Sequence, residues 1–178
     1  MSWQEEDLKL LLSAVDELSD YLNSPINDWK LSPSRLILTP GRIMLAKKRV
    51  SVLKSSTADV NSLSERIDRL IELKKGSWQR KIDAEVPRRI LIWKNMLADY
   101  AEDVIDGSYP AQVANRVMIE LLFAESRFLQ ASSETGIEKL DNELRGLSKN
   151  GDFIWDELLQ PVFPLPDYWY LYIQKLKG

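Results

Sequence analysis

The chain has 178 residues, a net charge of −3, 44% apolar residues and 29% charged residues, a composition typical of a globular protein. It contains no cysteine and no histidine. Disulfides, zinc–thiolate sites, iron–sulfur clusters and Cys nucleophiles are therefore excluded, as are Ser-His-Asp triads and His-based metal sites. Catalysis is left to carboxylates, lysine, tyrosine or backbone dipoles, so the sequence favours a protein that is not an enzyme.

No apolar run approaches the roughly 18 residues that a membrane-spanning helix requires. The segment 1–12 lacks the basic region and the cleavage site of a signal peptide. We therefore expect a soluble, cytoplasmic protein without a membrane partner, and the absence of cysteine fits that location.

Charge is distributed unevenly along the chain. Residues 29–94 carry sixteen Lys and Arg against six Asp and Glu, whereas 1–28 and 95–160 are acidic. This asymmetry predicts either an anionic partner for the middle segment or helices of opposite charge that pack together and neutralise each other. We favour the second interpretation.

The first predicted helix is Trp3–Tyr21, which has a regular apolar seam and a capping-box sequence that begins at Ser2. Proline and turn residues exclude a helix from the segment that follows, where Arg35–Thr39 can form a short extended piece. Thr39 as N-cap and Pro40 as first helical residue then predict a second helix.

A third helix is predicted to begin near Ala58. We expect Gly76 to end it and Ser77 to cap the next helix, because glycine is common just after helix ends and serine at helix starts. The alternative is one kinked helix that runs through this point.

The helix predicted over Ser77–Val104 organises the chain. Its apolar residues recur three or four apart and place Trp78 and Trp93 on one stripe, which predicts that both are buried in the core. Pro87 lies in the middle of this helix and should kink or restart it.

The remaining predicted elements are helices over Ala111–Gln130, Glu134–Leu147 and Phe153–Leu159, and an extended segment over Pro161–Pro166. Together the elements predict a single all-α domain, an irregular bundle of six to seven helices without a convincing sheet and with extended Pro-rich connections. Its expected parts are helix one (1–22), a connecting loop (23–39), a helical core (40–148) and a C-terminal clasp (149–178).

The pattern V-x-x-R-[IV]-x-I occurs on two consecutive predicted helices and places Arg89 and Arg116 beside apolar stripes. A partly buried guanidinium needs a carboxylate or phosphate partner. Glu85 and Glu120, each four residues away, can supply local ion pairs, which is the interpretation we favour. The alternative is a two-arginine anion site, and Arg88 is a separate candidate contact for an anion or a partner in the basic segment 29–94.

Lys47, Lys48 and Arg49 form the densest basic group of the segment 29–94. Such a group can follow a phosphate backbone, so a nucleic-acid-associated accessory protein is an alternative function. No helix-turn-helix spacing, glycine-rich phosphate loop or stacking aromatic pattern accompanies it, and nucleic acid is therefore not the favoured partner.

One helix end carries four carboxylates spaced three or four residues apart, as in all-α Mg²⁺-dependent hydrolases. A metal site would need a second acidic helix opposite, and carboxylates on a polar helix face are ordinarily solvated. We expect neither a metal nor a cofactor, and the candidate ligands for the alternative are Asp99, Glu102, Asp103 and Asp106.

The C-terminal segment is rich in aromatic residues, including Tyr168, Trp169 and Tyr172. An aromatic tail left exposed would promote association. We expect it to fold back over the bundle as a clasp, and the alternative is a contact with a partner or with a second copy of the chain.

These observations predict a non-enzymatic helical interaction or scaffold protein that is a monomer or a homodimer. They identify neither its protein partner nor its pathway. The alternatives are the nucleic-acid-associated protein that uses the segment 29–94 and the Mg²⁺-dependent hydrolase that uses helix carboxylates.

Overall fold

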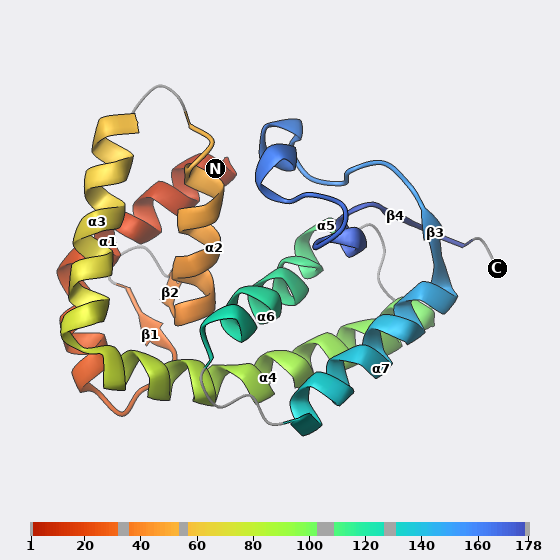
Figure 1. The fold of residues 1–178 in the computed structure, drawn as a ribbon, viewed down its shortest axis with the longest axis horizontal. Coiled ribbons are helices and arrows are strands. Elements are labelled where there is room, and N and C mark those ends of the chain that lie inside the picture. Colours follow the sequence, from red (N-terminus) through yellow and green to blue (C-terminus); the bar gives the residue numbers. More distant parts are fainter. Residues whose placement is uncertain (1, 32–35, 54–56, 103–108, 127–130, 177–178) are drawn as a thin grey trace.

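The computed structural model describes residues 2–31, 36–53, 57–102, 109–126 and 131–176. These residues are predominantly helical, which confirms the predicted all-α class (Figure 1). The α-helices of the described chain are α1 (Trp3–Asn23), α2 (Pro40–Val50), α3 (Thr57–Leu73), α4 (Lys75–Ala101), α5 (Tyr109–Gln112), α6 (Ala114–Glu125) and α7 (Ala131–Leu147).

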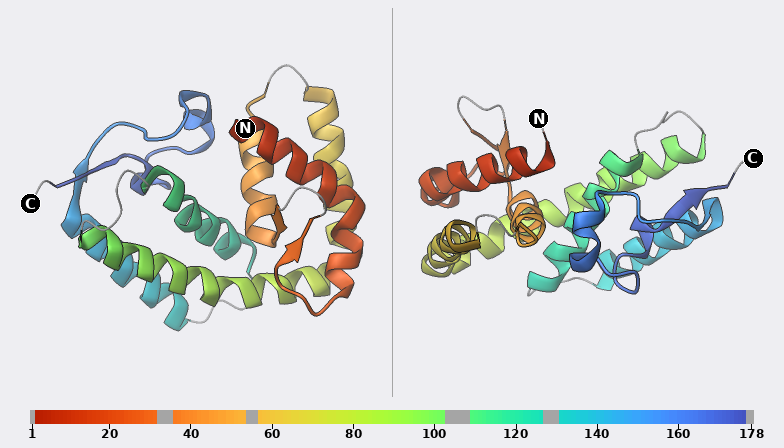
Figure 2. Two further views of the ribbon diagram at one scale, coloured as in Figure 1. Left: turned by 180° about the vertical axis from the view of Figure 1, so that it is seen from behind. Right: turned by 90° about the horizontal axis from the view of Figure 1, so that it is seen from above.

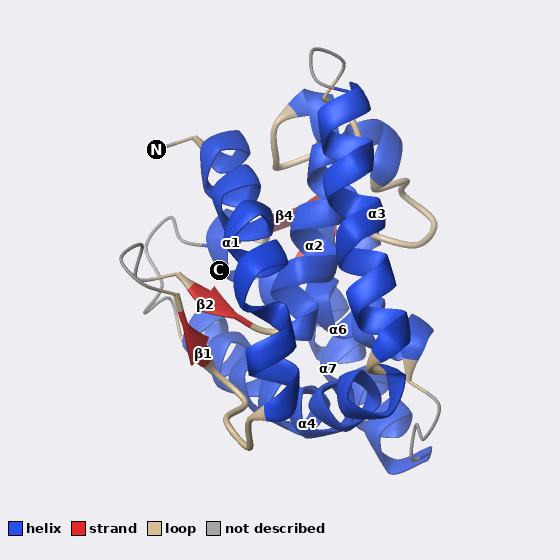
Figure 3. Cartoon of the chain, turned by 90° about the vertical axis from the view of Figure 1, so that its left-hand side faces the viewer, coloured by secondary structure: helices blue, strands red, loops and turns tan. Residues whose placement is uncertain are grey.

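Two short antiparallel ladders, which the sequence did not predict, accompany the helices (Figure 3). β1 (Trp29–Lys30) pairs with β2 (Ile37–Leu38), so the extended piece expected before α2 is one half of a ladder. β3 (Ser148–Asn150) pairs with β4 (Ile173–Lys175). This second ladder brings the last described residues back to the end of α7.

The starts of α1 and α2 are capped as the sequence predicts. Ser2 Oγ accepts a hydrogen bond from Glu5 N at 3.3 Å, and Glu5 Oε2 accepts one from Ser2 N at 2.9 Å. Thr39 Oγ1 accepts a hydrogen bond from Arg42 N at 3.4 Å, and Pro40 is the first residue of α2. These local motifs fix where each helix begins and therefore which side chains share a face.

Lys74 alone separates α3 from α4, so the predicted helix boundary at Gly76 and Ser77 is wrong. Both residues lie inside the first turn of α4. The chain turns at Lys74, whose φ and ψ are −123° and 33°, and Lys74 Nζ donates a hydrogen bond to Asn23 Oδ1 at 2.7 Å. The chain therefore turns two residues before Gly76, where local rules placed the helix end, and a contact with the end of α1 accompanies the turn.

The long helix α4 contributes to two apolar cores (Figure 1). Its first half packs Trp78 and Ile82 against α1, α2 and α3, which together form the N-terminal lobe. Its second half packs Trp93 and Leu97 against α6, α7 and residues 148–176, which with α5 form the C-terminal lobe (Figure 2). Trp78 is 3% exposed and Trp93 is fully buried, which confirms their predicted place in the core.

Pro87 lies where the two halves of α4 meet, and the helix continues through it without the restart considered from the sequence. Proline removes one backbone donor, which leaves the carbonyl of Asp83 without its intrahelical partner. Pro87 and Asp83 are both exposed, so water can solvate that carbonyl.

The predicted helix Ala111–Gln130 is two helices in the structure. α5 begins earlier, at Tyr109, and α6 follows after Val113 and ends at Glu125, whereas the predicted end at Gln130 lies outside the described residues. The next helix, α7, begins at Ala131, before the predicted start at Glu134.

The predictions for residues 153–166 are wrong. In place of a helix over Phe153–Leu159 and an extended Pro161–Pro166, the chain forms a 3₁₀ helix, η2 (Glu157–Val162). Asp156 Oδ1 accepts a hydrogen bond from Leu158 N at 3.0 Å and caps this turn. Proline is compatible with a short 3₁₀ turn, and Pro161 therefore lies inside η2.

Residues 148–176 fold back over the C-terminal lobe, which confirms the predicted intramolecular clasp. Phe163 is fully buried, as are Tyr170 and Leu171 in the second 3₁₀ helix, η3 (Trp169–Leu171). Tyr109 Oη donates a hydrogen bond to the Tyr170 carbonyl at 2.9 Å and thereby joins α5 to the tail.

Candidate partner-binding cleft

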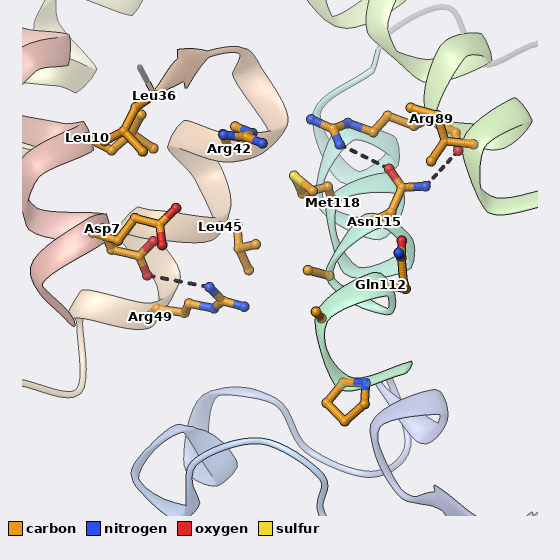
Figure 4. Close-up of a pocket in the computed structure, with 15 residues that line it drawn as sticks. Asp7, Leu10, Leu36, Arg42, Leu45, Arg49, Arg89, Gln112, Asn115 and Met118 are labelled. Carbon is orange, nitrogen blue, oxygen red and sulfur yellow. Dashed lines mark hydrogen bonds and ion pairs between the residues drawn. The ribbon is translucent and has the colours of Figure 1, made fainter. Parts of the chain in front are cut away.

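A cleft of about 430 Å³ lies between the two lobes (Figure 4). α1 and α2 form one wall, and α4, α5 and α6 form the other. A position between two cores is one where proteins commonly bind ligands. The lining combines arginines with apolar side chains and includes Leu10, Arg42, Leu45, Arg49, Arg89 and Met118.

A buried polar network around Glu85 lies at one end of this cleft. Glu85 is 4% exposed, and its Oε1 accepts hydrogen bonds from Thr39 Oγ1 at 2.7 Å and from Arg89 Nε at 2.8 Å. Its Oε2 accepts a hydrogen bond from Gly41 N at 2.9 Å. The carboxylate thus satisfies an N–H in the first turn of α2, where the helix dipole favours negative charge.

Gly41 permits this close approach of α2, α4 and α6. A Cβ atom at this position would lie 2.9 Å from Glu85 Oε1 and 3.2 Å from Met118 Cβ. Any larger residue would therefore push the carboxylate or α6 away from the start of α2.

Arg89 extends the network from α4 to α6. Its Nη1 donates a hydrogen bond to Asn115 Oδ1 at 3.0 Å, and Asn115 Nδ2 donates one to the Arg89 carbonyl at 2.7 Å (Figure 4). Together with its predicted ion pair to Glu85, at 2.8 Å, these contacts engage Arg89 within its own chain. Arg89 therefore positions one wall of the cleft.

Arg116 faces away from the cleft, so the structure does not bring it together with Arg89 as an anion site. It is 4% exposed and forms two hydrogen bonds with Asp141, at 3.0 and 2.9 Å, and one with Glu120 at 2.9 Å. Burial is the largest single effect and disfavours its charge, but the hydrogen bonds to Asp141 and the attraction of Tyr170, Asp141 and Glu120 together exceed it and raise the pKa of Arg116. Arg116 thus forms the predicted ion pair with Glu120 and a second one, with Asp141, that the sequence did not predict.

Arg42 has a guanidinium without a partner among the described residues. Its backbone N–H bonds to Thr39, but its side chain, which lines the cleft, forms no hydrogen bond or ion pair with the described chain. Burial, and next the positive charge of Arg89, lower the pKa of Arg42. An arginine carries five N–H donors, and no nitrogen of Arg42 is among the buried unpaired atoms of the described structure, so these donors can bind water or the oxygen atoms of a ligand.

Arg49 also retains unused donors. Its Nη1 lies 3.7 Å from Asp7 Oδ2, too far for a hydrogen bond (Figure 4). Its carbon Cζ lies 4.4 Å from the centre of the Trp155 ring. Within the described structure, the buried atoms Arg49 Nε and Asp7 Oδ2 have no hydrogen-bond partner. Buried polar atoms are normally paired, so both mark a place for further contacts.

Burial raises the pKa of Asp7 to about 6, although the positive charge of Arg49 acts in the opposite direction. Burial likewise lowers the pKa of Arg49, against the attraction of Asp7. A titratable pair perturbed in this way, inside a cleft, is typical of functional sites.

The tail bridges the two walls at the other end of the cleft. Asp156 Oδ2 accepts a hydrogen bond from Trp3 Nε1 of α1 at 3.0 Å, and Trp155 Nε1 donates one to the Pro110 carbonyl of α5 at 2.6 Å. Trp155 also stacks against Arg49. The cleft is therefore held at both ends, by the Glu85 network and by residues 155–156.

Several basic residues that the sequence predicted as anion or partner contacts have partners within the chain. Lys47 forms an ion pair with Asp68, and Arg88 forms one with Asp28. Lys48 Nζ lies over the rings of Phe163 and Tyr168, 5.4 and 5.3 Å from their centres. Of these contacts, the Arg88–Asp28 ion pair joins the segment 29–94 to an acidic segment, whereas Lys47 pairs within the segment and Lys48 contacts aromatic rings.

The candidate metal ligands Asp99 and Glu102 are exposed at the end of α4, and Asp103 and Asp106 lie outside the described residues. Among the described residues, no three acidic side chains are grouped so that they could hold a metal ion. The predicted partner-contact residues of the tail differ in exposure: Tyr168 is 6% exposed within its own core, whereas Trp169 and Tyr172 are half-buried.

The sequence reasoning missed Asp7, Arg42 and Asn115 as cleft residues. They come from α1, α2 and α6, and no local pattern connects positions so far apart. One signal was available: Arg42 and Arg49 are seven residues apart in α2, which places both on one side of the helix.

Comparison with protein-family models, with curated proteins and with solved structures finds no match to this chain. In the described part of the chain, no helix has both the length and the apolar character to cross a membrane. Function is therefore argued from the cleft itself.

Proposed function

We propose that this is a non-enzymatic, cytoplasmic interaction protein that holds a segment of a protein partner in the cleft between its lobes. The observation that carries the proposal is the guanidinium of Arg42, which is half-buried in the cleft and unpaired among the described residues. Partial burial disfavours the charge of Arg42, and a partner's acceptor atoms would stabilise that charge at donors that the chain itself leaves free.

The chemistry of the lining supports binding over catalysis. Leu10, Leu45 and Met118 form an apolar floor, although each is at most 6% exposed, and Arg42 and Arg49 offer fixed positive charge. Arginine is one of the residues that supply most of the free energy of protein–protein binding.

The test is site-specific photocrosslinking in the native host, followed by a measurement on the purified pair. A photoreactive amino acid replaces Gln112, which is exposed and lines the cleft, and in a control it replaces Arg66, which is exposed on α3. We expect one protein, either a different chain or a second copy of this one, to crosslink from position 112 and not from position 66.

The crosslinked protein is then purified and titrated against the wild type, Arg42→Ala and Arg66→Ala. Loss of a charged hydrogen bond in a desolvated site predicts an affinity at least about tenfold weaker for Arg42→Ala. Arg66→Ala removes the same charge outside the cleft and should bind like the wild type. Equal crosslinking from both positions, or equal affinity of both variants, would contradict the proposal.

A further inference from the structure

Arg42, Leu45 and Arg49 form a strip along the side of α2 that faces the cleft (Figure 4). Their spacing of three and then four residues places them on one helix face, with the arginines about 10 Å apart along the axis. The strip therefore presents two positive charges with an apolar side chain between them.

On the opposite wall, α5 and α6 contribute apolar and neutral polar side chains to the cleft and, among the described residues, no acidic ones. Met118, Ala111 and Ala114 line the cleft from α5 and α6, with the neutral amides of Gln112 and Asn115. The acidic groups of the cleft, Glu6 and Asp7, lie on α1, where Asp7 is 3.7 Å from Arg49. Arg42 is attracted by Glu6, Glu85 and Asp28 but forms no ion pair with them within the described structure, so its guanidinium is open to a ligand that lies in the cleft.

A second hollow, of about 210 Å³, continues from the cleft and shares Arg42, Arg89 and Ile92 with it. Ile92 is 47% exposed at this shared edge. This second hollow lies on the far side of Arg42 and is also lined by Asp28 and Glu85, so an acidic ligand of Arg42 and Arg49 would lie in the cleft and not in the hollow.

We propose that the cleft recognises an acidic helical segment whose two carboxylates, about 10 Å apart on one side, bind Arg42 and Arg49 and flank an apolar residue. In a helix, acidic residues at i and i+7 with leucine at i+3 or i+4 have this spacing. An extended strand places same-side residues about 6.7 or 13 Å apart and does not match. The inference rests on the proposed interaction function and specifies the chemistry of the partner.

Two stapled fluorescent peptides of identical composition test it. Both carry two glutamates and one leucine on an alanine-rich helix; the matched peptide has glutamates at i and i+7, and the control has them at i and i+2. In fluorescence anisotropy at physiological salt we expect the matched peptide to bind at least about tenfold more tightly. Free adipate, a dicarboxylate without a polypeptide, serves as competitor.

Arg42→Ala and Arg49→Ala should each weaken binding of the matched peptide about tenfold, whereas Arg66→Ala should not change it. Arg49→Lys is the second variant at that position, because it keeps the charge near Asp7 and Trp155 but loses the planar fork; circular dichroism checks the fold of each. We expect Arg49→Lys to bind less tightly than the wild type.

Equal binding of both peptides, or equal losses in all arginine variants, would show unspecific charge attraction and overturn the inference. Adipate that competes as well as the matched peptide would overturn it in favour of a small dicarboxylate. If neither peptide binds while a protein still crosslinks from position 112, the acidic-helix inference fails and the interaction function stands. If both experiments are negative, both proposals fail.

Discussion

At the scale of single residues, Asp7 is the most unusual carboxyl group of the described chain. It is 8% exposed, one oxygen lacks a hydrogen-bond partner among the described residues, and burial raises its pKa to about 6. Ionised Asp7 is therefore less stable in the folded protein than in the unfolded chain. The attraction of Arg49, at 3.7 Å, offsets only part of the lost hydration.

This residue should make stability fall as pH rises. Because the folded pKa exceeds the unfolded one, the contribution of Asp7 is fully present below about pH 4 and is lost as pH rises through about 6. Two pH units correspond to about 3 kcal/mol. Asparagine does not ionise, so we expect Asp7→Asn to lose no stability at this position over this pH range. The free energy of unfolding of the variant minus that of the wild type should therefore rise by roughly 2–3 kcal/mol between pH 4 and pH 7.5.

Urea unfolding of both proteins across this pH range measures the difference. Other groups titrate in both proteins and cancel, and Asp16→Asn on the exposed face of α1 is the matched control. A difference between Asp7→Asn and wild type that does not change with pH would contradict the raised pKa.

At the scale of helices and strands, the sequence predicted an element's position most accurately where neighbouring residues alone determine it. Ser2 and Thr39 cap α1 and α2 as expected, because a cap needs only neighbouring backbone groups. The corner lies at Lys74 and not at Gly76, and the Lys74 side chain bonds there to Asn23 at the end of α1, a contact between residues distant in sequence that local rules do not include. Likewise, η2 forms around Pro161 in a segment that proline suggested would be extended.

The close contact between α2 and α4 requires glycine at position 41, because glycine has no side chain. In Gly41→Ala the new Cβ would lie 2.9 Å from Glu85 Oε1, so the carboxylate or the helix must shift. We expect a destabilisation of about 1–3 kcal/mol in urea unfolding, the range for overpacked interiors.

Gly146→Ala in α7 is the matched control, since nothing lies within 4 Å of its Cβ position. Replacing this helical glycine should stabilise the protein by about 0.5–1 kcal/mol, because alanine loses less backbone entropy on folding. Effects of the same sign at both positions would argue against the packing explanation for Gly41.

At the scale of the whole molecule, the all-α class and the clasp followed from the sequence, but the cleft did not. Periodic apolar residues such as Trp78 and Trp93 identify core faces without reference to their partners. The cleft depends on how Asp7, Arg42 and Asn115, from three helices, come to lie around one space. Their positions are set by packing between lobes, which no local pattern encodes.

The tail should stabilise the molecule without changing its oligomeric state. Deletion of residues 167–178 removes the buried side chains of Tyr168, Tyr170 and Leu171 from the C-terminal core. We expect a loss of at least about 3 kcal/mol, which lowers the melting temperature by roughly 6–12 °C. Light scattering should give the same mass per particle for both proteins, whereas a full-length dimer that yields a stable truncated monomer would assign the tail to assembly.

The passage of α4 through both cores also has a consequence for cooperativity. Neither core can lose its order while the other keeps the whole helix intact, because Trp78 and Trp93 are anchored on the same helix, α4. The two lobes should therefore melt as one unit, with a calorimetric enthalpy equal to the van't Hoff enthalpy in scanning calorimetry. Two separable transitions would mean that Pro87, between the halves, uncouples them.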